Sequence, residues 1–219
     1  MTPRTNPDFS GPHDYGDSVA RTPDPVLKRT LLDQVVRYLA ENGIGHLSLR
    51  PMAQALGMSP HRLMHHFGPK DEMIAAALAR ATETQEDVQA TWFAEHPTMT
   101  QPQLLRRWWY WLVDDPTNLA LMRLGLEAAT LDARVTSLPM DVRAEQIGVW
   151  RTEIESRFVA AGVPRIAAAI EASIAKATFT GLAVDLMASG DADRLTEALE
   201  EYLRTLVHRI ATLSGHKSK

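Results

Sequence analysis

The most constraining feature of the sequence is the run LRPMAQALGMSPHRLMHHF, in which two short helical segments flank a glycine. Helices are predicted over Leu49–Leu56 and Pro60–His66. Ala53 is the small residue that lets two helix backbones approach closely, and Gly57, four residues later, accepts the positive φ that the turn needs. An aliphatic residue follows six positions further on, at Leu63. This joint spacing is typical of a helix-turn-helix.

The second of these helices has a polar face. Its apolar positions, together with those of the first helix, are expected to lock the two helices together, which leaves His61, Arg62 and His65 outward. Arginine and histidine can donate hydrogen bonds to base edges in a major groove, so these three are the predicted base-reading residues. Hydroxyl, cationic and backbone N–H groups at the helix ends suit phosphates. The predicted phosphate contacts are Ser48, Arg50, Ser59, His66 and Lys70.

His61 and His65 also have the i, i+4 spacing of two zinc ligands. No carboxylate or third histidine is placed nearby to complete such a site. We therefore interpret this pair as DNA contacts and expect no metal.

The rest of the chain is predicted to be all-α, with about nine helices and no sheet. Residues 1–23 are rich in Pro, Gly, Asp, Ser and Thr and are expected to form a disordered arm. Asp24 is a candidate cap for the first helix, and Asn42-Gly43 is the expected stop. The other predicted helices are Pro25–Glu41, a long helix from about Lys70, Gln101–Asp114, Pro116–Ala133, Asp141–Ala161, Pro164–Ala188 and Asp191–Leu213.

Charge is distributed unevenly along the 219 residues. The net charge is −4, yet residues 21–75 carry seven basic and five acidic side chains. A mildly basic head on an acidic body suits a protein that binds DNA with one part only. The chain has no cysteine, which is compatible with a reducing cytoplasm, and neither a membrane span nor a secretory signal is predicted.

The stretch Arg106–Trp111 contains four consecutive aromatic residues in a predicted helix. Consecutive helical positions point in different directions, so two of the four are expected in the core and the others at contacts between domains or subunits. Aromatic walls are also usual in small-molecule pockets between helices, which is the alternative for at least one of them. The candidates for pocket lining are Trp108, Trp111, Met122, Trp150, Phe158, Phe179 and Asp185, with plain core packing as the alternative.

The last two predicted helices have faces suited to close packing. Pro164–Ala188 is crowded with small residues, and Asp191–Leu213 carries leucines at helical spacing. Two such helices from each of two chains could form a four-helix dimer interface, although an intrachain bundle would have the same pattern.

The segment from residue 25 to about 78 resembles the DNA-binding domain of TetR-type transcriptional regulators. The resemblance rests on AENG at the end of the first helix, on SLRPMAQALGMS, and on LMHHFGPKDEM. It implies a homodimer on a palindromic double-stranded DNA operator, usually a repressor released by a small-molecule effector. Met64 stands where the family usually has a phosphate-binding tyrosine, and His61 and Arg62 replace smaller residues.

The expected function is therefore a cytoplasmic DNA-binding regulator. No nucleophile elbow, phosphate loop or HExxH motif is present, so neither an enzyme nor a cofactor is expected. The alternatives are an activator, a ligand-independent regulator, or a helical enzyme or carrier with a vestigial helix-turn-helix. The expected division is an arm at 1–23, a DNA-binding domain at 24–78, a ligand-binding and dimerisation domain at 79–213, and a tail at 214–219.

Overall fold

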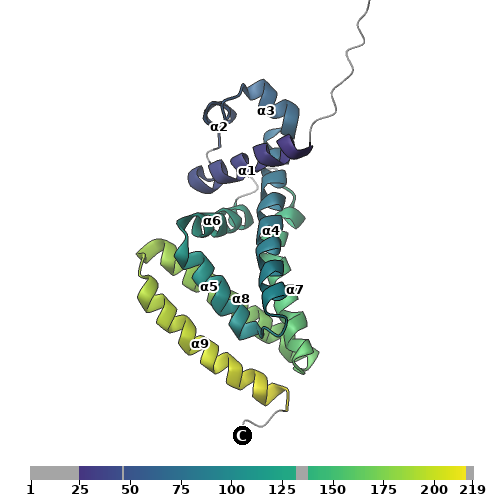
Figure 1. Cartoon of the computed structure of the whole chain (residues 1–219), viewed down its shortest axis with the longest axis vertical. Helices are drawn as coiled ribbons and strands as arrows, with labels where there is room; N and C mark the ends of the chain where they lie inside the picture. The colour runs from purple at the N-terminus through teal and green to yellow at the C-terminus, as the bar shows by residue number, and fades with distance from the viewer. Residues whose placement is uncertain (1–24, 46, 132–137, 216–219) are drawn as a thin grey trace, which may run out of the picture.

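The computed structural model describes residues 25–45, 47–131 and 138–215, and within these it contains nine helices and no strand (Figure 1). The predicted all-α class is confirmed, and the helix ends differ from the predicted ones by three residues or fewer. Asp24 lies outside the described residues. The helices are α1 Pro25–Asn42, α2 Leu49–Ala55, α3 Pro60–Phe67, α4 Lys70–Glu95, α5 Gln101–Asp114, α6 Pro116–Thr130, α7 Met140–Ala160, α8 Arg165–Ser189 and α9 Ala192–Leu213.

Local chemistry explains several helix boundaries. Gly43 and Gly57 adopt φ values of +77° and +67° at the ends of α1 and α2, where other residues would be strained. The Asp115 side chain accepts a hydrogen bond from the Thr117 backbone N–H at 2.8 Å and so caps α6. Thr100 and Gln103 form a capping box at the start of α5. The connections are therefore specified locally, which fixes the order in which the helices pack.

Two hydrophobic cores are stacked along the long axis of the molecule. The N-terminal core joins α1, α2, α3 and the first half of α4 with Leu124 and Ala128 of α6. The C-terminal core joins the end of α4 with α5, α7, α8 and α9. In Figure 1, α4 runs down from the level of α1 beside α7, and α6 lies between α1 and α5. Helices α4 and α6 thus connect the upper end of the molecule with its body.

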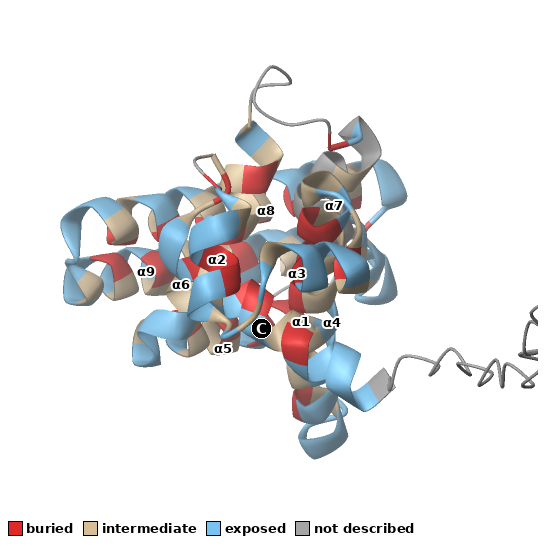
Figure 2. Cartoon of the chain, turned by 90° about the horizontal axis from the view of Figure 1, so that it is seen from above, coloured by how far each residue is buried: buried red, intermediate tan, exposed pale blue. Residues whose placement is uncertain are grey.

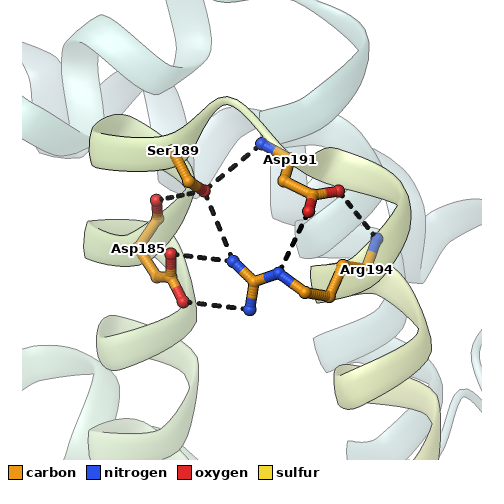
Figure 3. A network of polar contacts seen from close by, with 4 residues as sticks. All are labelled: Asp185, Ser189, Asp191 and Arg194. Carbon is orange, nitrogen blue, oxygen red and sulfur yellow. Dashed lines mark hydrogen bonds and ion pairs between the residues drawn. The ribbon is translucent and has the colours of Figure 1, made fainter.

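The turn between α8 and α9 is held by a polar network (Figure 3). Arg194 donates to both oxygens of Asp185, at 3.0 and 3.3 Å, and to Asp191 at 3.1 Å. The hydrogen bond from Arg194, and next that from Ser189, lowers the pKa of Asp185. Asp185 therefore closes this turn rather than lining either of the cavities described below.

Helix α8 is long and apolar enough to cross a membrane by length and composition alone. The core helix of a water-soluble bundle meets the same test, and α8 buries Ala168, Ala172, Ala175 and Phe179 against the C-terminal core. Its composition is therefore weak evidence for a membrane span.

A bidentate ion pair between Arg106 and Glu200 connects α5 to α9. Arg106 Nε and Nη2 lie 2.6 Å from Glu200 Oε1 and Oε2, respectively. The hydrogen bond from Arg106 lowers the pKa of Glu200, although burial opposes the shift. Because the carboxyl is more acidic in the folded chain, its contribution to stability is present above the ordinary value of 4.5 and is lost as the pH falls through the lowered folded pKa.

Replacing Glu200 with glutamine is expected to lower the free energy of unfolding at pH 7 by about 0.5–1 kcal/mol, as for a partly exposed pair. The variant should also lose less stability than the wild-type protein between pH about 5 and pH about 3, because the titrating carboxyl is gone. Urea unfolding at these pH values measures both effects. Glu197→Gln, at an exposed position of α9, is the matched control, and equal acid sensitivity of the wild-type and Glu200→Gln proteins would contradict the prediction.

Candidate functional site

The helix-turn-helix is assembled by buried residues of α2 and α3. Met52, Ala53 and Leu63 are fully buried, and Phe67 is nearly so. The Met58 backbone N–H donates to the Ala53 carbonyl at 2.9 Å, which draws the turn onto α2. The small side chain of Ala53 thus lies where the backbone approach is closest, and α3 has one inward and one outward face.

The outward face of α3 carries the three predicted base-reading residues. His61, Arg62 and His65 are all exposed, and Met64 beside them is 43% exposed. The Arg62 backbone N–H donates to Ser59 Oγ at 3.2 Å, so the serine caps α3 and fixes its first turn. Figure 2 looks onto this end of the molecule, where α1, α2 and α3 meet the solvent. The arginine and the two histidines therefore share one accessible surface.

The residues predicted at phosphates lie at or next to the ends of α2, α3 and α4. Ser48, Arg50 and Ser59 are exposed, and His66 and Lys70 are partly buried. The Ser48 side chain makes no capping bond to α2, unlike that of Ser59. In the described part of the chain, no ion pair involves Arg50, Arg62 or Lys70. These charges are thus available to an external anion.

A cavity lies between α4, α5, α6, α7 and α8. It has about 860 Å³ of space not occupied by atoms, part of which opens to solvent. Its walls are mostly aliphatic and aromatic, with Thr82, Gln85, Thr180 and Lys176 as the polar exceptions. Helix α6 alone supplies Leu121, Met122, Leu124, Gly125 and Leu126.

The structure brings three of the predicted lining residues to this cavity, namely Met122, Trp150 and Phe179. Trp108 instead lines a smaller neighbouring cavity, which shares Trp150 with the first. Trp111 and Phe158 line neither cavity: Trp111 packs at a right angle on Trp108, with ring centres 5.0 Å apart, and Phe158 is fully buried in the C-terminal core.

The aromatic run of α5 forms much of that core. Trp108 and Trp109 are buried, and Trp109 Nε1 donates to Thr196 Oγ1 of α9 at 2.8 Å. Tyr110 points outward and is 44% exposed. Trp150 lies 4.7 Å from Trp108 between ring centres, so the cavity wall is continuous with this aromatic cluster.

Lys176 is a cavity residue that the sequence analysis did not single out. Burial, and next the positive charge of Arg151, lowers the pKa of its ammonium group. Arg151 itself pairs with Glu155 at 2.8 Å, whereas no described residue forms a hydrogen bond or ion pair with Lys176. A lone lysine in the middle of an Ala- and Ile-rich helix was the signal that could have identified it.

A second polar connection missed by the sequence analysis joins α6 to the end of α1. Glu127 Oε1 accepts from the backbone N–H groups of Ile44 and Gly45 at 2.9 and 2.8 Å. Arg123 Nη2 donates to the Ala40 carbonyl at 2.6 Å, one of the last carbonyls of α1. A side chain at Gly43 would place its Cβ 3.1 Å from the Glu127 carboxylate, and the backbone φ of +77° also favours glycine here. The helix that walls the cavity is therefore bonded directly to the helix-turn-helix end.

One face of α8 is apolar and open to solvent in the single chain. Ile166, Ile170, Ile174 and Val184 are 82, 55, 40 and 49% exposed. With the exposed Ala177 and Gly181 they recur at three- and four-residue spacing and form one continuous face, here called the α8 stripe.

Comparison of the sequence with profiles of known protein families and with curated proteins finds no significant match. Comparison of the fold with solved structures does find significant matches. A transcriptional regulator from Rhodococcus sp. Rha1 superposes with a TM-score of 0.64 at 24% identity, over 83% of this chain and 96% of its own. A transcriptional regulator from Saccharomonospora viridis, solved with choline, superposes with a TM-score of 0.60 at 18% identity, over 83% of this chain and 97% of its own.

A structure from Rhodococcus sp. described as a TetR-family transcriptional regulator gives a TM-score of 0.59 at 20% identity, over 79% of this chain and 96% of its own. These likenesses extend over both cores and not only over the helix-turn-helix. The chain therefore has the fold of TetR-family transcriptional regulators.

Proposed function

We propose that the protein is a DNA-binding transcriptional regulator, and specifically a cytoplasmic, homodimeric repressor that a small molecule releases from a palindromic operator. The exposed face of α3 is the main support for DNA binding. Helix α3 buries Leu63 and Phe67 and presents His61, Arg62 and His65 together on an exposed surface. An outward helix face with such donors is what major-groove recognition requires.

The proposed DNA contacts are of two kinds, those that read base edges and those that position the protein on the phosphate backbone. His61, Arg62 and His65 read base edges, and Ser48, Arg50, Ser59, His66 and Lys70 contact phosphates. Met64 lies on the same exposed surface, 43% accessible, and has no donor for a phosphate. We assign its apolar atoms to contact with a thymine methyl group.

The cavity and the α8 stripe support the other two parts of the proposal. The cavity has apolar walls and few polar groups, as small-molecule sites do. The α8 stripe is an apolar face of the kind that a second copy covers in a homodimer. Effector binding then shifts the equilibrium between two spacings of the α3 helices of the two copies, here called the reading helices.

The alternatives are an activator, a ligand-independent regulator, and a helical enzyme or carrier whose helix-turn-helix is vestigial. Selection from a random double-stranded DNA library with the full chain separates the last of these from all the others. We expect an enriched palindrome with half-sites about one helical turn or slightly more apart, and a gel shift with the DNA upstream of the protein's own gene. If neither DNA is bound at moderate salt, the proposed function is wrong.

Arg62→Ala is expected to change sequence discrimination, whereas Lys70→Ala is expected to change overall affinity for DNA. Arg62→Ala should reduce discrimination at one base position of the selected site by about 1–3 kcal/mol, because a base-edge contact is lost. Lys70→Ala should weaken binding to all sequences alike and reduce the salt slope by about 1. Fluorescence anisotropy on matched and mismatched sites across a salt series measures both, and equal effects of the two variants on every sequence would contradict the division.

A further inference from the structure

We propose that the effector is an organic anion: a small apolar chain or ring with one carboxylate, which binds in the cavity against Lys176. The inference rests on the proposed function, because it assumes that the cavity receives the effector. It adds the chemical class of the ligand and names the residue that selects it.

The walls determine the apolar part of the ligand. Leu78, Leu105, Trp150 and Phe179 come from four helices and face the same space. Thr82, Gln85 and Thr180 are neutral and can exchange hydrogen bonds with a polar atom of either kind. None of these residues determines the sign of the ligand's charge.

Lys176 determines the charged part. It is the one charged side chain among the described residues that line the cavity, and no described residue pairs with it. Burial disfavours its charged form, and Arg151 adds a second positive charge nearby. Lys176 is partly buried, so its ammonium group is partly removed from water and has no protein partner among the described residues. A carboxylate placed against it would supply the missing charge-assisted hydrogen bond.

The aromatic walls raise the opposite possibility, a quaternary ammonium stacked on Trp150 and Phe179. The two rings are 5.8 Å apart and tilted by 41°, and such surfaces attract cations. One protein of similar fold was solved with choline. Here, however, a cation would lie in the same cavity as Lys176 with no carboxylate among the described lining residues, so repulsion decides in favour of an anion.

The test compares probes that share an apolar tail and differ in the charge of the head group. Octanoate and 4-phenylbutyrate are titrated into the full chain alongside 1-octanol, 4-phenylbutanol and octyltrimethylammonium, with tryptophan fluorescence and calorimetry as readouts. We expect at least one acid to bind the wild-type protein at least 10-fold more tightly than its alcohol, and the ammonium compound to bind least.

Two substitutions assign that preference to Lys176. Lys176→Met should bind the acid and its alcohol equally well, whereas Lys176→Arg should retain the preference. In the absence of any probe, Lys176→Met should unfold at a higher temperature than wild type, because an unpaired cation has been removed. Lys28→Met, at an exposed position of α1, makes the same substitution outside the cavity and should change neither property.

If neither acid binds more tightly than its alcohol, or if Lys176→Met retains the preference, the inference is wrong. DNA selection with the wild-type protein is scored separately. A selected operator without charge preference in the cavity would leave the proposed function intact and remove only the anion. Acid selectivity without DNA binding would leave the anion-binding cavity intact and show that the proposed DNA-binding function is wrong.

Discussion

An Ile170→Glu variant is expected to sediment as a monomer and to bind a library-selected palindrome at least about 100-fold more weakly than the wild-type protein. Ile170 lies within the α8 stripe and is 55% exposed in the single chain. If two copies pack through this face, the new carboxylate is desolvated and lies close to its symmetry mate. A monomer then has only one reading helix for a two-part site.

Analytical ultracentrifugation and fluorescence anisotropy measure the two effects. Ala94→Glu adds the same charge at an exposed position of α4, outside the stripe, and should leave both properties unchanged. A second stripe variant, Ile174→Glu, should reproduce the result of Ile170→Glu. A dimer that survives both stripe substitutions would show that another surface joins the two copies, and the proposed interface would be wrong.

Most of the fold could be predicted because its boundaries are encoded locally. Gly57, the cap at Ser59 and the proline at position 60 act within one turn of the chain, and the structure places α2 and α3 where they indicate. The same holds at Asp115, whose side chain caps α6. Such signals do not depend on tertiary contacts, and they specify nearly every helix end.

The inward and outward faces of α3 were also predictable, because helical periodicity determines them. Leu63 and Phe67 are buried, while His61 and His65 are exposed. Whether these exposed residues contact DNA remains a prediction, since an accessible side chain does not identify its partner.

The cavity could be predicted only in part, because its walls come from five helices far apart in the sequence. Hydrophobicity does not distinguish Phe179, at the cavity, from Phe158, which is buried in the adjoining core. That difference depends on the side of each helix that faces a neighbour, and pattern alone does not give the neighbour. Lys176 was missed because one lysine in a long helix is more often solvated.

The connection through Glu127 was unpredictable for a further reason. Its partners are backbone N–H groups more than eighty residues earlier in the chain, in a loop whose own sequence indicates only a turn. Nothing in the residue types of α6 selects them, so the contact emerges only when α6 packs under α1. It nevertheless gives α6 two roles, since the same helix supplies five residues to the cavity wall.

Glu127→Leu is therefore expected to destabilise the helix-turn-helix end more than the body. The substitution leaves the Ile44 and Gly45 N–H groups without their acceptor in a part-buried position, which should lower the free energy of unfolding by about 2–3 kcal/mol. Glu127→Gln retains an amide oxygen that can accept from the same donors, and should lose about half as much. Urea unfolding measures the difference, and Glu197→Leu, at an exposed position of α9, is the control.

Amide hydrogen exchange decides whether this loss is local. Protection of Ile44 and Gly45 should fall in Glu127→Leu, while the amides of α8 keep their rates relative to global unfolding. Because Arg123 would still bond the Ala40 carbonyl, α1 should remain docked while the loop that precedes α2 becomes mobile. A reading helix carried on a mobile loop has less fixed spacing, so affinity for the selected palindrome should fall by at least about 10-fold. Unchanged exchange at both amides would instead mean that apolar packing of Leu124 and Ala128 in the N-terminal core holds the loop in place without the Glu127 hydrogen bonds.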